Sequence, residues 1–297
     1  MNPWIRRGLF AAAALAALAA GTVGAGTLLA EQRMNRKVEI APTALVLKAD
    51  AATLERGRYL YTSRGCADCH GEDGAGRTFI DDGKGLKVAG PNISPGPGSV
   101  VAAYRAQDWD RTLRHGVKPD GRPLMIMPAE DYNRLTDSDV AAIASYVKQL
   151  APAAGGAAVL KLPLPVRAAY GFGLIDDAAT KIDHTLPPAQ PVAEGVTVEH
   201  GRYVAAMCVG CHGKDLAGGK IPGGPPDWPA AADLRPGPQG ALARYPDADA
   251  LIALFKSGRR ADGSVVKVMP FEALGRLSDT DARALHLYLK SRGTTAG

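Results

Sequence analysis

The motif Cys-x-x-Cys-His occurs twice in the chain, and its two copies contain all four cysteines of the sequence. Many other positions repeat at the same offset of 142 residues (208 − 66). A constant offset over so many positions indicates two copies of one domain. The repeated positions include Cys66, Cys69 and His70 with Cys208, Cys211 and His212, Asp120 with Asp262, Met127 with Met269, and Tyr146 with Tyr288.

We place the two domains at residues 52–150 and 197–295. Residues 151–196 between them are rich in Pro, Gly and Ala, which predicts an extended linker. Within this linker, residues 166–176 are expected to pack against one of the domains.

Both repeats have helical patterns. In the first repeat, Thr136 is a good N-cap, and Asp139 follows at the spacing of a capping box. The apolar positions after it have the period of an amphipathic helix. We also expect first helices near residues 52–63 and 198–207 and a short helix near 107–115. No stretch alternates as a strand would, so the sequence predicts an all-α fold.

Residues 1–37 form a separate N-terminal segment. No charge occurs from Gly8 to Ala30, a run of 23 residues (30 − 8 + 1), which is long enough to cross a bilayer. Residues 1–49 hold six Lys/Arg and two Asp/Glu, a net charge of +4. This charge beside an apolar run indicates membrane orientation and not nucleic-acid binding. The run is either a retained anchor, which its length favours, or a cleaved signal. Arg6 and Arg7 place the rest of the chain outside the inner membrane in both cases.

Three kinds of site use closely spaced cysteines. A zinc site needs four ligands, commonly from two neighbouring pairs, and a redox dithiol needs no following histidine. Covalent haem attachment uses all three residues, because two thiols bond to the haem and the histidine binds its iron. Only 6% of the residues are aromatic, so the centre of each domain needs something besides aromatic side chains to fill it. The sequence therefore predicts two covalent haem c groups on Cys66, Cys69, Cys208 and Cys211, with His70 and His212 as iron ligands.

Methionine is a common second axial ligand of haem iron. Met127 follows His70 by 57 residues (127 − 70), and Met269 follows His212 by the same 57 (269 − 212). Met125 is less suitable because Lys267 stands at its matching position. We therefore expect Met127 and Met269 to complete the two iron sites.

A histidine that binds a metal usually donates its other N–H to a carbonyl. Residues 90–94 place Pro91 to accept this hydrogen bond in the first repeat, and Ala232 has the same place in the second. The remaining histidines do not repeat. We expect His115, His184 and His200 at the surface or in loops, and His286 packed in a helix face.

These motifs resemble the class I cytochrome c fold. They are similar, more narrowly, to the multihaem cytochrome c subunits of membrane-associated bacterial dehydrogenases, such as alcohol and gluconate dehydrogenases. The resemblance rests on ERGRYLYTSRGCADCHG, GPNIS, RHGVKPDGRPL and MPAEDYNRLTDSDVAAIASYVKQL. It implies two tandem all-α domains in which the first and last helices cross. Gly57 and Tyr59 would then meet Tyr146, and Gly201 and Tyr203 would meet Tyr288. Several such subunits have three haem motifs where this chain has two.

Two irons closed on both sides favour an electron carrier over an enzyme. We expect single-electron relay in the periplasm, from a dehydrogenase or quinol-oxidising complex to another cytochrome or a terminal oxidase. The expected partners are thus redox proteins, and the expected location is the inner membrane, or the periplasm if the signal is cleaved. The alternative is a dihaem peroxidase, which needs one haem with an open iron position. A third possibility, a subunit that holds a catalytic partner at the membrane, overlaps with the first.

Overall fold

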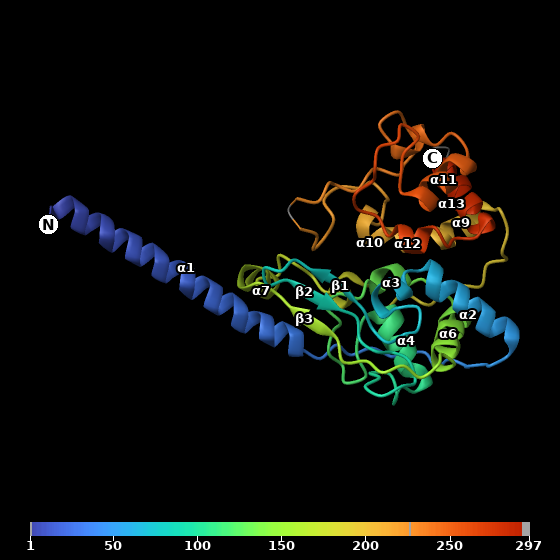
Figure 1. The fold of residues 1–297 in the computed structure, drawn as a ribbon, viewed down its shortest axis with the longest axis horizontal. Helices are drawn as coiled ribbons and strands as arrows, with labels where there is room; N and C mark the ends of the chain where they lie inside the picture. Colours follow the sequence, from blue (N-terminus) through green and yellow to red (C-terminus); the bar gives the residue numbers. More distant parts are fainter. Residues whose placement is uncertain (1, 226, 293–297) are drawn as a thin grey trace.

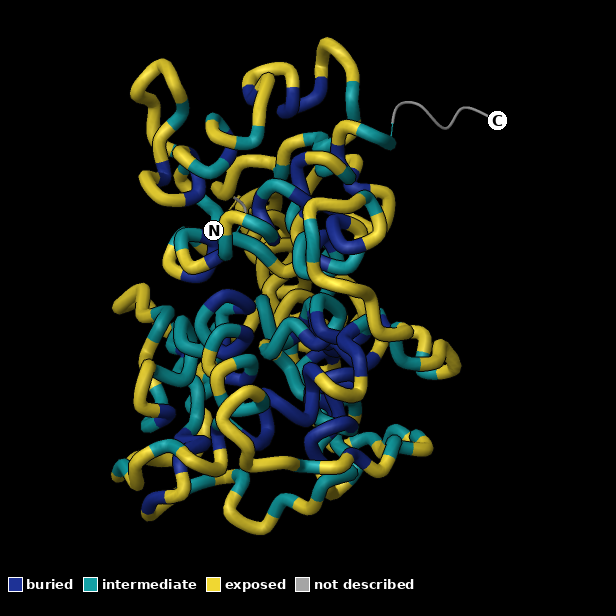
Figure 2. The backbone as a smooth tube through the Cα atoms, turned by 90° about the vertical axis from the view of Figure 1, so that its right-hand side faces the viewer, coloured by how far each residue is buried: buried dark blue, intermediate teal, exposed yellow. Residues whose placement is uncertain are grey.

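The computed structural model describes residues 2–225 and 227–292. Two helical domains lie against each other, and a long N-terminal helix projects from one side (Figure 1). Buried residues gather in two separate centres, one in each domain (Figure 2). The expected end of the second domain, residue 295, lies outside the described residues.

The projecting helix is α1 (Pro3–Asn35). Asn2 caps its N-terminus by accepting a hydrogen bond from the Trp4 amide at 3.1 Å. By length and composition, α1 qualifies as a membrane-spanning helix. Most of it is exposed, but Gly26 and Ala30 near its end are buried.

The first domain is built on two crossing helices, α2 (Ala51–Ser63) and α6 (Asp137–Lys148). They cross at Gly57, where an added Cβ would lie 2.1 Å from the carbonyl oxygen of Ala142 and 2.7 Å from the Cβ of Tyr146. Only glycine permits this approach. The ring paired with Tyr146 is Tyr61, at 5.5 Å between centroids, and not Tyr59 as expected. Three shorter helices complete the domain: α3 (Cys66–His70), α4 (Ala106–His115) and α5 (Ala129–Tyr132).

The second domain repeats this plan with α9 (Val198–Ala205) and α13 (Asp279–Ser291). They cross at Gly201, where a Cβ would lie 1.9 Å from the carbonyl oxygen of Ala284. The other elements are the helices α10 (Val209–His212), α11 (Ala248–Ser257) and α12 (Phe271–Leu274), with the 3-10 turns η1 (Ala206–Cys208) and η2 (Ala241–Arg244).

A small antiparallel sheet is the main departure from the expected absence of strands. It has the order β1 (Thr78–Asp81), β2 (Lys87–Ala89) and β3 (Val159–Lys161). These strands have three or four residues each, which is too short for an alternating pattern to stand out in the sequence. The sheet ties the linker to the first domain.

The linker is also more structured than expected. It contains α7 (Leu164–Gly171) and α8 (Ala178–Lys181). Residues 166–176 were expected to pack against a domain, but α7 packs against α1. α8 packs against α5 of the first domain, where Lys181 pairs with Glu130 at 2.6 Å.

Candidate haem sites

The two Cys-x-x-Cys-His segments adopt closely similar local structures. Each histidine ends a short helix, α3 or α10, and is followed by a glycine at φ = +78°. This backbone conformation favours glycine and turns the chain sharply away from the histidine. In the first domain, the Tyr61 hydroxyl also donates to the carbonyl of Gly71 at 2.6 Å, which fixes that turn.

Each histidine makes the same backbone hydrogen bond. The Nδ1 atom of His70 lies 3.0 Å from the carbonyl oxygen of Pro91, and that of His212 lies 2.8 Å from the carbonyl oxygen of Ala232. A carbonyl can only accept, so Nδ1 carries the proton and Nε2 keeps its lone pair for another partner. Burial lowers the pKa of both rings, although the carbonyl opposes this shift. Both imidazoles are thereby held neutral, the form that binds a metal.

None of the four cysteines forms a disulfide, and Cys66 is buried. Burial raises the pKa of Cys66 and Cys208 to about 12 and that of Cys69 to about 11. A redox dithiol needs the opposite shift, towards the thiolate. Within residues 2–225 and 227–292, no group of three or more His, Cys, Asp or Glu could hold a metal ion. These observations disfavour both alternatives to haem.

Met127 and Met269 lie in matching turns. Each is partly buried against the core of its own domain, and its carbonyl accepts a hydrogen bond from the residue two positions later. Pro128 and Pro270 follow as the N-cap residues of α5 and α12. In each domain, the methionine and the first cysteine of the motif thus border one apolar core. Together with the histidine and the second cysteine, they form a donor set that suits haem c. That both methionines bind iron remains a prediction.

Two matching hydrogen bonds cross the interface between the domains, one in each direction. Tyr59 of α2 donates to Asp281 of the second domain at 2.7 Å, and Tyr203 of α9 donates to Asp139 of the first at 2.5 Å. The capping boxes are therefore only half formed. Thr136 does cap the amide of Asp139 at 3.1 Å, but the Asp139 carboxylate bonds to Tyr203 and Arg56 instead.

The exchange is stronger on the Asp281 side. Asp281 also accepts from Arg64 at 2.8 Å and contacts Nε2 of His200 at 2.7 Å. All three side chains are almost completely buried. Burial opposes ionisation of Asp281, but Arg64 and the hydrogen bonds together lower its pKa. The expectation that His200 lies at the surface or in a loop was wrong, because its ring is buried in α9 beside Asp281.

His115 was also expected at the surface or in a loop, and it is buried at the end of α4. Its Nδ1 lies 3.0 Å from Nδ1 of His184 in the linker. Burial lowers the pKa of His115 to about 4, and His184 contributes to the shift. His286 is packed as expected, with Nε2 at 3.0 Å from the carbonyl oxygen of Tyr245.

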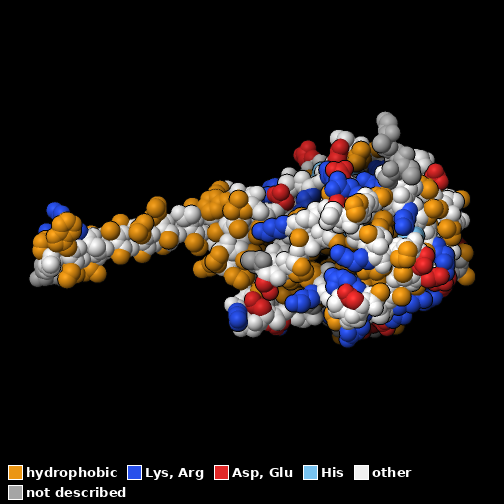
Figure 3. Space-filling view, turned by 90° about the horizontal axis from the view of Figure 1, so that it is seen from above, with side chains coloured by type: hydrophobic (Ala, Val, Ile, Leu, Met, Phe, Trp, Pro, Cys, Tyr) orange, Lys and Arg blue, Asp and Glu red, His pale blue; other side chains and the backbone are white. Residues whose placement is uncertain are grey.

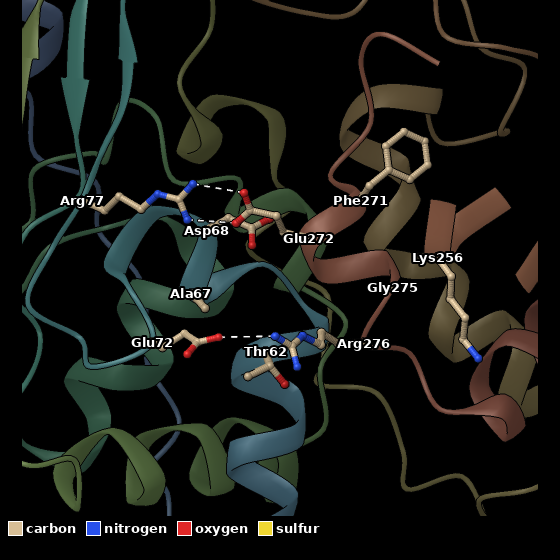
Figure 4. Close-up of a pocket in the computed structure, with 10 residues that line it drawn as sticks. All are labelled: Thr62, Ala67, Asp68, Glu72, Arg77, Lys256, Phe271, Glu272, Gly275 and Arg276. Atoms are coloured by element: carbon tan, nitrogen blue, oxygen red, sulfur yellow. Dashed lines mark hydrogen bonds and ion pairs between the residues drawn. The ribbon is translucent and has the colours of Figure 1, made fainter. Parts of the chain in front are cut away.

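Both Cys-x-x-Cys-His segments reach the interface between the domains. The Asp131 carboxylate of α5 accepts from the Gly210 amide of α10 at 2.7 Å, and burial raises the pKa of Asp131 to about 8. On the other side, Ala67 and Asp68 of α3 line a polar cleft beside Phe271 and Glu272 (Figure 4).

Two ion pairs cross this cleft: Arg77 with Glu272 at 2.9 Å, and Arg276 with Glu72 at 3.4 Å (Figure 4). Sequence reasoning missed these residues, as it missed Arg64 and Asp131. The sequence held a signal only for the two Tyr–Asp hydrogen bonds between the domains. Asp139 repeats as Asp281, and a tyrosine precedes each cysteine pair.

Each of the two domains matches a known protein family. Residues 54–151 match the family described as cytochrome c, and residues 198–289 match the family described as cytochrome c oxidase, cbb3-type, subunit III. The chain is therefore a cytochrome with two cytochrome c domains, a class of electron-transfer protein.

The chain is also similar to particular cytochromes and cytochrome subunits. The chain is 29% identical to the fructose dehydrogenase cytochrome subunit of Gluconobacter japonicus, over 82% of this chain and 53% of the relative. It is 28% identical to the alcohol dehydrogenase (quinone) cytochrome c subunit of Gluconobacter oxydans, over 82% and 55%. It is 27% identical to a diheme cytochrome c-type protein of Cereibacter sphaeroides, over 79% and 84%.

The chain thus spans only about half the length of the two dehydrogenase subunits. These relatives are named as cytochromes or cytochrome subunits and give no support to the peroxidase alternative.

Proposed function

We propose that the chain is a dihaem electron-transfer subunit of a membrane-associated dehydrogenase. Its two haem c groups would be held by Cys66 and Cys69 in the first domain and by Cys208 and Cys211 in the second. The iron ligands would be His70 with Met127, and His212 with Met269. Bound haem supplies an iron that carries one electron at a time.

One observation carries this proposal: both histidines point Nδ1 at a backbone carbonyl in the same way. A carbonyl at this position fixes the ring and leaves Nε2 for the iron. The repetition matters because the second copy keeps the contact although it has Ala232 in place of Pro91. Two sites with the same donors favour two closed irons, and closed irons transfer electrons without binding substrate.

The remaining residues would set the path of the electron. α3 and α10 both reach the interface between the domains, where Asp131, Arg64 and Asp281 fix their relative position. These contacts would keep the two haem sites in one relative position. The donor would be a dehydrogenase or a quinol-oxidising complex, and the acceptor another cytochrome or a terminal oxidase. We place the domains in the periplasm, anchored to the inner membrane by α1.

Mass spectrometry of the denatured mature protein, combined with a redox titration followed by low-temperature spectra, tests this function. We expect two covalently bound porphyrins and two low-spin His/Met signals, each with its own potential. The same mass reports whether residues 1–35 are retained. Fewer than two bound porphyrins would refute the dihaem assignment. A high-spin or His/His signal in the resting protein would favour the peroxidase alternative, which peroxide turnover by the reduced protein then tests.

A further inference from the structure

The linker helix α7 crosses α1 through small residues. A Cβ added to Gly171 would lie 1.9 Å from the carbonyl oxygen of Gly26, and one added to Gly26 would lie 2.7 Å from the Cβ of Ala168. Ala30, one turn further along α1, has no exposed surface. Small residues allow such close helix crossings in membranes. The end of α1 is therefore packed into the folded protein.

The position of this crossing relative to a bilayer follows from helix length. About 20 helical residues cross the apolar core of a bilayer. If α1 enters the membrane after Arg7, it leaves the apolar core near Thr27. The crossing at Gly26 then lies at the outer surface of the membrane, and α7 lies beside it.

Charged residues begin directly beyond this level, and they are paired with the linker. Arg36 makes two hydrogen bonds of 2.7 Å to Asp177, and Arg33 pairs with Asp176 at 3.0 Å. Glu31 pairs with Arg167 at 2.5 Å. These pairs fix the direction in which α1 leaves the body of the protein.

Three large apolar side chains of the same segment are exposed to a large extent, although the Phe172 ring also lies beside Gly26 of α1. Leu164 is 60% exposed, Phe172 45% and Leu174 78%. We call these three residues the seating surface. Apolar side chains also gather where α1 meets the body of the protein in the space-filling view (Figure 3). Exposed apolar side chains beside a membrane helix indicate contact with a partner of low polarity.

We propose that the seating surface inserts into the outer leaflet of the bilayer beside α1. The partner is the phospholipid itself, at the boundary between head groups and acyl chains, where amphipathic segments bind. This inference rests on the proposed anchoring by α1 and goes beyond it, because anchoring by α1 does not by itself place any residue outside that helix in the lipid. With the seating surface inserted, the first domain faces the membrane at a fixed tilt.

Nitroxide labels test this arrangement in the full-length holoprotein, reconstituted alone in phosphatidylcholine nanodiscs. Single cysteines replace Leu174 in the seating surface, Leu18 in the middle of α1, and Val265 in an exposed turn of the second domain. Leu18 is 67% exposed and Val265 53%, so all three labels replace open side chains. Collisions with oxygen, which concentrates in lipid, are compared with collisions with a water-soluble nickel chelate. Wild-type protein treated identically gives the background.

We expect the Leu174→Cys label to follow the Leu18→Cys label, with an oxygen-to-nickel accessibility ratio several-fold above that of Val265→Cys. If Leu174→Cys follows Val265→Cys while Leu18→Cys is in lipid, the seating surface is refuted and the anchor stands. If Leu18→Cys is also in water, or its residue is missing from the mature protein, the anchor itself fails. Shielding of Leu174→Cys from both reagents would mean a protein contact and would also refute insertion.

Discussion

At the residue scale, the most informative contact is the hydrogen bond from each predicted iron-binding histidine to a carbonyl. Pro91 was expected to accept it in the first domain, and Ala232 in the second, and both contacts are present. The carbonyl belongs to the backbone, so the contact survives a change of side chain. The two sites can then differ in the stiffness of their loops while they keep the same donors.

Replacing either predicted axial methionine should affect one haem only. In Met127→Ala or Met269→Ala, the iron of that domain loses the sulfur that raises its potential, so it should become high-spin and its potential should fall. Low-temperature spectra during a redox titration would then show one low-spin signal in place of two.

Met125→Ala is the matched control, since Met125 has no counterpart in the second domain, and both signals should persist. If Met127→Ala leaves its haem unchanged and Met125→Ala does not, Met125 is the ligand in the first domain.

At the element scale, each domain depends on one close crossing of its first and last helices. The crossing requires Gly57 in the first domain and Gly201 in the second, because a Cβ would overlap the carbonyl oxygen of the opposing helix. The overlap is with backbone, which cannot rotate away as a side chain can.

Gly57→Ala and Gly201→Ala should each destabilise the domain that contains the substitution. Overpacking of this kind costs about 1–3 kcal/mol, and the backbone overlap places the cost at the upper end. Thermal unfolding followed by haem absorbance and circular dichroism measures it. Gly156→Ala serves as control, since its Cβ would meet nothing within 4 Å. Equal effects of all three substitutions would mean that the crossings are not tightly packed.

At the scale of the whole molecule, each domain donates a tyrosine hydrogen bond to an aspartate of the other. The two aspartates are matched in sequence, but their surroundings differ in burial. Asp139 pairs with Arg56 of its own domain, whose side chain is 28% exposed, whereas Asp281 pairs across the interface with Arg64, which is 3% exposed. Loss of one partner from a buried pair leaves an uncompensated charge. The Asp281 side should therefore dominate the stability of the interface.

Asp281→Asn should lower the free energy of unfolding by about 3–5 kcal/mol, the usual cost of breaking a buried ion pair. Asp139→Asn should cost less, because water can reach Arg56. Denaturant unfolding of the two variants and the wild type gives both values. A cost for Asp139→Asn equal to that of Asp281→Asn would show that burial of Arg64 is not decisive.

Acid should remove the stabilisation that ionised Asp281 provides. The folded pKa of Asp281 is lowered, so its stabilising effect is complete above the unfolded pKa of about 4 and is lost as pH falls through the folded pKa. The difference in unfolding free energy between wild type and Asp281→Asn should thus shrink below about pH 4. A difference that stays constant down to pH 2 would contradict the pKa shift.

The sequence by itself determined the repeat, the helices at the ends of each domain, and the candidate haem residues. These features depend on local spacing: Cys-x-x-Cys-His fits one helical turn, and Thr136 and Ser278 cap helices from within their own segments. The sequence did not predict the short strands, because so few residues cannot show an alternating pattern.

Only the tertiary structure decided how the domains meet. Asp139 and Asp281 stand where a capping box would place them, and nothing in the local sequence shows that their carboxylates turn towards the other domain. The burial of His200, the contact of Asp131 with Gly210 and the packing of α7 on α1 likewise join residues from separate segments. Such contacts depend on which surfaces the folded domains bring together, and local sequence patterns do not show which surfaces these are.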